Sequence, residues 1–204
     1  MQEISWLRRR VALPNISAQA ALIFVVVYFL LAVGVSIILS HDPNWGRWHI
    51  SYLGEGNSFS ANFFNAAMMI GGFFMAGFSL LFHKYLVSIG ARYPKLITVC
   101  FLLISLCIYL IGLFPRSFGI LPHDIFGHVI YFAFLLLCLT TPWSLPGQKR
   151  WFYAVSYLFH VAMLILFILY WTGVSESLYA AEAATFIFFI GWTVILLGRK
   201  HYNG

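Results

Sequence analysis

Long apolar runs separated by short polar connections are the dominant pattern along this chain. The runs lack both the alternation of a barrel strand and the polar stripe of a soluble amphipathic helix. About 20 helical residues cross a hydrocarbon core of roughly 30 Å, and a helix satisfies its own backbone groups there. The pattern therefore predicts a single all-α transmembrane domain, a six-helix bundle. The predicted spans are about residues 18–39, 61–82, 96–114, 120–141, 151–172 and 178–197.

Composition agrees with this prediction, because 62% of the 204 residues are apolar and 9% are charged. The start resembles the basic region of a signal peptide, but the apolar run that follows is too long and lacks small residues spaced for cleavage. We therefore expect an uncleaved first helix. Cys100, Cys107 and Cys138 all fall inside predicted spans, where we expect buried thiols rather than disulfides between loops.

The basic residues predict the orientation of the bundle. With the N-terminus in the cytoplasm, only Arg47 and Arg116 of the 12 Lys and Arg residues lie outside. Both termini are then cytoplasmic, and the net charge of +6 reflects topology and membrane lipids rather than a nucleic-acid partner. The ten cations predicted inside are Arg8, Arg9, Arg10, Lys84, Arg92, Lys95, Lys149, Arg150, Arg199 and Lys200.

The same orientation places nearly all acids on the outer side, so that side carries the unusual chemistry. Its longest loop, residues 40–60, mixes tryptophan and tyrosine with Ser51 and Glu55. Aromatic residues at this level often lie at the headgroup boundary. A loop of about 20 residues is also long enough to form an ordered lid.

A cluster of ionisable residues opens the fourth predicted span. Asp124 and His128 are four residues apart and therefore share one helix face, whereas His123 lies on another. His160 is near the middle of the fifth span. Ionisable groups are costly in lipid, so we expect both deep histidines to face the bundle interior or a water-filled cavity.

Three chemistries fit this cluster. The three histidines, or two of them with Asp124, would leave one position of a zinc ion open for water. An Asp-oriented histidine near Ser51 or Glu55 would instead activate water against a lipid ester or amide. In the third reading the groups are structural, and Asp124 caps the positive end of its helix.

Arg116 is one of the two cations predicted outside and lies a short loop before the cluster. A guanidinium there pairs with an acid or holds a phosphate. The alternative is a loop arginine that extends toward lipid headgroups.

The order of short motifs over Trp48–Leu137 resembles the uncharacterised prokaryotic six-helix membrane family known as domain of unknown function 998. The resemblance implies a fold and a location in a prokaryotic cell membrane, but no established reaction. Either His123 or His128 matches the family histidine that opens helix four. The other matching residues are Ser51, Leu53, Gly54, Asn65, Gly112, Phe114 and Pro115.

Two more distant resemblances bear on function. The layout is similar to Frag/DRAM/Sfk-type membrane proteins, some of which are linked to lipid-anchor remodelling or lipid transport, and this implies a lipid-facing role by analogy. Alkaline-ceramidase-type hydrolases also use Ser, Asp and His at one membrane face. This chain departs from them in having six predicted helices and no paired HxxxH in its last helix.

The leading hypothesis is an outward-opening polar pocket among helices two to five, roofed by the loop of residues 42–60, that binds or handles a lipid or another amphipathic molecule. The alternatives are an accessory or assembly subunit of a larger membrane complex, with partner membrane subunits, and a metal-dependent intramembrane lipid hydrolase. The catalytic candidates are Asp124, His128 and His160, and the metal candidates add His123. The candidate ligand-binding residues are Ser51, Glu55, Asn65, Arg116, His123, Asp124 and His128.

Overall fold

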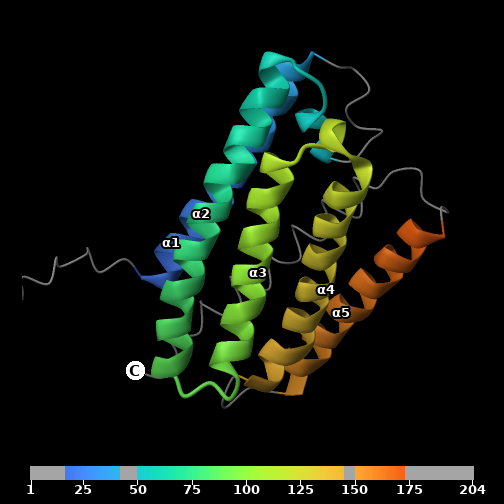
Figure 1. Ribbon diagram of the computed structural model, residues 1–204. Coiled ribbons are helices and arrows are strands. Elements are labelled where there is room, and N and C mark those ends of the chain that lie inside the picture. Colours follow the sequence, from blue (N-terminus) through green and yellow to red (C-terminus); the bar gives the residue numbers. More distant parts are fainter. Residues whose placement is uncertain (1–16, 42–49, 145–149, 173–204) are drawn as a thin grey trace, which may run out of the picture.

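The computed structural model describes residues 17–41, 50–144 and 150–172, and all regular structure in these ranges is helical. Five α-helices follow one another along the chain, with two short 3₁₀-helices in the connections (Figure 1). The elements are α1 (Ala18–Ser40), η3 (Ile50–Gly54), α2 (Phe59–Ser88), α3 (Pro94–Leu113), η4 (Arg116–Phe118), α4 (Ile120–Ser144) and α5 (Arg150–Trp171).

Successive helices run antiparallel and pack side by side. The most extensive contact joins α2 to α3, with α1 against α2, α4 against α3 and α5 against α4 (Figure 1). We call the end that carries η3 and η4 the upper end, and the end that carries the α2–α3 turn the lower end. The start of α2, the end of α3 and the start of α4 therefore meet at the upper end.

Within the described ranges, α1 to α4 are long and apolar enough to cross a membrane. Their exposed surface carries large apolar side chains such as Leu31, Ile38 and Phe73, as expected of helices that face lipid rather than water. The predicted fifth span corresponds to α5, and the predicted sixth span, 178–197, lies outside the described residues.

The largest difference from the predicted boundaries is in α2, which extends six residues past the apolar stretch that ends at Phe82 and finishes at Ser88. It continues through His83 and Lys84 because polar side chains at a membrane boundary do not interrupt backbone hydrogen bonding. Hydropathy marks the lipid-embedded part of a helix, whereas the backbone ladder decides where the helix ends.

Helix starts are fixed by local capping. The hydroxyl of Ser17 accepts a hydrogen bond from the amide of Ala20, and that of Ser58 accepts one from Ala61, each at 3.1 Å. These oxygens satisfy amides that a first helical turn leaves without partners. Helix α3 instead begins with Pro94, whose missing N–H costs nothing at that position.

Small residues in α2 let both neighbouring helices approach closely. A Cβ on Gly71 would lie 2.6 Å from the Phe29 ring of α1, and one on Gly72 would lie 2.9 Å from the carbonyl oxygen of Ser105 in α3. The Ser105 hydroxyl donates a 2.6 Å hydrogen bond to the carbonyl of Gly72. Close backbone approach and a polar bond thus hold α2 against α3.

Replacing Gly72 by alanine should lower the stability of the bundle. The added methyl group collides with backbone atoms of α3, and overpacking of this kind typically costs about 1–3 kcal/mol. Gly77→Ala in the same helix is the control, because a Cβ there meets no atom within 4 Å. Thermal unfolding of both variants in detergent gives the comparison; equal melting temperatures would contradict the close contact.

Candidate functional site

The upper end brings together residues from η3, α2, η4 and α4 that are far apart in the sequence. The two 3₁₀-helices contact each other; η3 also packs on α1 and α2, and η4 also packs on α4. Most of the sequence-predicted ligand residues lie in these elements or beside them. The site is therefore built from helix ends and the turns that join them, at a common level of the bundle (Figure 1).

Asn65 ties the loop before α2 to the helix bundle. Its side-chain amide donates a 2.9 Å hydrogen bond to the carbonyl of Gly54, at the end of η3. Gly54 packs so closely that a Cβ would overlap the Asn65 side chain and lie 2.8 Å from the Phe64 ring. The arrangement satisfies a buried backbone carbonyl and requires glycine at position 54.

Gly112 of α3 makes a similarly close contact with α2. A Cβ there would overlap the backbone carbonyl of Asn65 and lie 3.0 Å from the amide of Met69. The last turn of α3 is thereby pressed against the turn of α2 that carries Asn65. Gly54, Asn65 and Gly112, which the sequence placed in separate motifs, form one packing unit.

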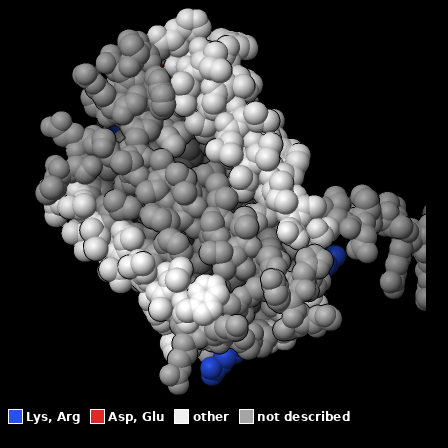
Figure 2. Space-filling model, turned by 180° about the vertical axis from the view of Figure 1, so that it is seen from behind, with Lys and Arg blue, Asp and Glu red and all other residues white. Residues whose placement is uncertain are grey.

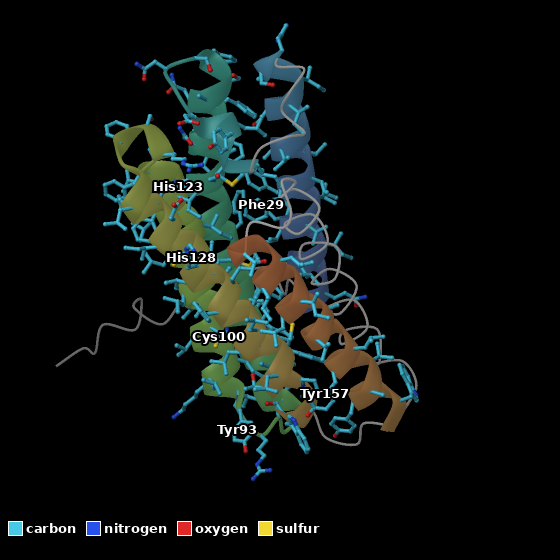
Figure 3. The ribbon with its side chains drawn as sticks, turned by 90° about the vertical axis from the view of Figure 1, so that its right-hand side faces the viewer. Phe29, Tyr93, Cys100, His123, His128 and Tyr157 are labelled. Atoms are coloured by element: carbon cyan, nitrogen blue, oxygen red, sulfur yellow. The ribbon has the colours of Figure 1, made fainter. Side chains whose placement is uncertain are left out.

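His123 is buried at the start of α4, with 6% of its surface exposed. Its Nδ1 lies 3.1 Å from the carbonyl oxygen of Phe114, the residue that ends α3. A carbonyl can only accept, so Nδ1 carries the proton and donates it, which leaves Nε2 of the neutral ring as an acceptor. The imidazole of α4 thus caps the end of α3 (His123 is labelled in Figure 3).

Arg116 begins η4 and lies over an aromatic ring of η3. Its Cζ is 4.8 Å from the centroid of the Tyr52 ring, within the range of a cation–π contact. Among the described residues at the upper end, Arg116 is the only Lys or Arg. The sequence indicated Tyr52 only as an interface aromatic; its role beside Arg116 depends on how the two loops fold.

The predicted pair of Asp124 and His128 takes a different form from the one expected. The Nδ1 atom of His128 hydrogen-bonds to the backbone carbonyl of Asp124 at 2.5 Å, so the acceptor in this bond is the main chain rather than the carboxylate. The ring of a helical histidine lies over the preceding turn, close to the carbonyl four residues back. This contact therefore supports the structural reading of His128, which lies further down α4 than His123 (Figure 3).

The remaining candidates belong to the same elements or lie next to them in the chain. Ser51 is half-buried in η3, Glu55 is exposed just after η3, and Asp124 is half-buried next to His123. Within the described ranges, no three His, Cys, Asp or Glu side chains come together in a group that could hold a metal ion. The backbone of His160 belongs to α5, and its side chain lies outside the described residues.

Charge is distributed unevenly over the surface. On the face drawn in Figure 2, the described Lys and Arg side chains form two clear blue patches toward the lower end. An all-helical fold with four long apolar helices and charge confined to the ends defines an integral membrane protein.

A comparison with known protein families assigns the chain to one of them. Residues 20–198 match the family described as "Protein of unknown function (DUF998)". Because this match covers most of the 204 residues, the chain belongs to that family. No curated protein and no solved structure matches the chain.

Asn65→Ala should loosen η3 without unfolding the bundle. The substitution leaves the carbonyl of Gly54 without its donor, a loss of about 1 kcal/mol, so amide hydrogen exchange in residues 50–54 should rise roughly fivefold. Asn62→Ala is the control, because the Asn62 side chain is exposed in the same helix. Unchanged exchange in the Asn65 variant would mean that this bond does not hold the loop.

Proposed function

We propose that the upper end of this protein binds the phosphate-bearing headgroup of a phospholipid or similar amphipathic molecule. The single observation that carries this proposal is the guanidinium of Arg116 lying over the Tyr52 ring. The ligand's acyl chains extend along the apolar helix surfaces, and its headgroup meets the polar residues of the two short 3₁₀-helices. Membrane lipids are therefore the proposed partners.

Arginine is the side chain best suited to this role. Its planar guanidinium forms two parallel hydrogen bonds to phosphate oxygens and stacks on an aromatic face at the same time. The Tyr52 ring restricts the orientation of the guanidinium, which reduces the conformational entropy lost when a phosphate binds. Arg116 lies just beyond the end of α3, so in the proposed membrane setting its positive charge would meet lipid headgroups.

The other polar residues at this end supply acceptors. Glu55 is exposed and Asp124 is half-buried, so both carboxylates can meet a cationic or hydroxylated part of a headgroup. Asn65 holds the loop in place through Gly54, and Ser51 lies in the same 3₁₀-helix. The proposal concerns binding of the headgroup and includes no bond cleavage.

The proposal includes an orientation in the prokaryotic cell membrane. With the termini in the cytoplasm, the described cations Lys84, Arg92 and Lys95 of the lower end lie inside and Arg116 lies outside. This follows the rule that cytoplasmic connections are enriched in Lys and Arg. The site then opens to the outer leaflet and to the space beyond it.

Arg116→Gln should reduce the amount of phospholipid that co-purifies with the protein by roughly tenfold, since a charge-assisted contact to phosphate is lost. Arg92→Gln is a matched control: Arg92 lies over the Tyr93 ring, at 5.1 Å, at the opposite end of the bundle. Native mass spectrometry of the gently solubilised chains measures the retained lipid. Equal retention in both variants, or a retained partner protein with no lipid, would favour an accessory subunit instead.

Single cysteines test the orientation. The three native cysteines are buried, so the parent protein should react little with a thiol reagent that cannot cross membranes. Ser117→Cys, in exposed η4, should be labelled in intact cells, and Ser88→Cys, exposed at the end of α2, only after lysis. The reverse pattern would place the upper end in the cytoplasm.

A further inference from the structure

The Arg116 guanidinium is a hydrogen-bond donor, whereas several other polar groups at the upper end are acceptors. Every N–H of arginine donates, whereas three other groups at the upper end that have no described partner accept: the carboxylates of Glu55 and Asp124 and the Nε2 atom of His123. A site with one donor group for phosphate and several acceptors beside it is suited to a headgroup that is anionic at one end and donates hydrogen bonds at the other.

The orientation of His123 makes it the most specific of these acceptors. Its Nδ1–H is committed to the carbonyl of Phe114, so the neutral ring can offer only a lone pair at Nε2. Nε2 has no hydrogen-bond partner within the described part of the chain. It is not fully enclosed either, because the only fully buried side-chain polar atom without a partner in those ranges is Thr141 Oγ1.

His123 is also held close to Arg116. Phe114, which accepts from the imidazole, is two residues before Arg116, and the intervening Pro115 begins the compact turn that closes with a 2.9 Å hydrogen bond from the amide of Phe118 to the carbonyl of Pro115. The His123 ring is therefore bonded to the same short, folded segment from which the Arg116 side chain extends. Both side chains are thus available at one part of the upper end, as recognition of a single small headgroup requires.

We infer that this site selects phospholipids whose headgroup carries an N–H donor on a cationic nitrogen, and that His123 is the residue that detects the donor. The inference rests on the proposed phosphate-binding role of Arg116. A primary ammonium can donate to Nε2 and to a carboxylate while the phosphate binds the guanidinium. A quaternary ammonium has the same charge but no N–H, so it leaves the buried acceptor without a partner.

A methylation series of one headgroup provides the test. The full-length protein is equilibrated with equal amounts of phosphatidylethanolamine, its monomethyl and dimethyl derivatives, and phosphatidylcholine, all with the same acyl chains, and bound lipids are counted by native mass spectrometry. The first three lipids should be retained about fivefold to tenfold more than phosphatidylcholine, because only the last methylation removes the final N–H. The nitrogen stays cationic throughout, so charge alone cannot produce such a step.

His123→Asn is the sharpest variant, because the asparagine amide can still donate to the Phe114 carbonyl while the Nε2 acceptor is gone. It should bind the four lipids equally and retain its dependence on Arg116. His83→Asn is the control: His83 makes a similar Nδ1 bond, 2.8 Å to the Thr98 hydroxyl, at the lower end. That variant should keep the full preference.

The possible outcomes separate this inference from the proposed function. Equal binding of all four lipids by the wild-type chain, still abolished by Arg116→Gln, would overturn the inference and leave phosphate binding intact. Failure to retain any phospholipid would overturn both. A preference that persists in His123→Asn would also overturn the role of His123. Displacement of the lipid by soluble phosphoethanolamine would support the same recognition, with a free phosphate ester as its source.

Discussion

The close approach of α2 to its two neighbours is the contact on which the rest of the structure depends. Lipid offers no hydrophobic driving force between helices, so packing and polar bonds must hold the bundle together. Gly71 admits the Phe29 ring of α1, and Gly72 admits the backbone of α3. Deeper in the bundle, Phe82 and Phe78 stack at 5.4 Å and both meet the edge of Phe101.

This packing also positions the candidate site. Because Gly112 lets the end of α3 lie against Asn65, the turn that follows α3 begins beside the loop that Asn65 holds. Arg116 and Tyr52, which are more than sixty residues apart in the sequence, are then brought together. The site is therefore a consequence of two glycine contacts and one amide bond, and these supporting residues bear on function without touching a ligand.

Similar hydrogen bonds join neighbouring helices at both ends of the bundle. At the lower end, the Thr98 hydroxyl donates to the carbonyl of Pro94 and accepts from His83, while the amide of Arg92 donates to the carbonyl of Ser144. These bonds close the α2–α3 turn onto α4. At the upper end His123 makes a comparable tie, and its second nitrogen has no described partner, so under the proposed function the same device leaves an acceptor for a ligand.

Sequence alone determined the helical class, the positions of the long apolar helices and the membrane setting, because lipid imposes length and hydropathy directly on the chain. It also marked Asn65, Gly112, Arg116 and His123 as unusual. The pairing of Asn65 with Gly54 and of Arg116 with Tyr52 was decided only by the tertiary structure. Such contacts depend on how loops fold across helix ends, where neither periodicity nor hydropathy constrains which side chains meet.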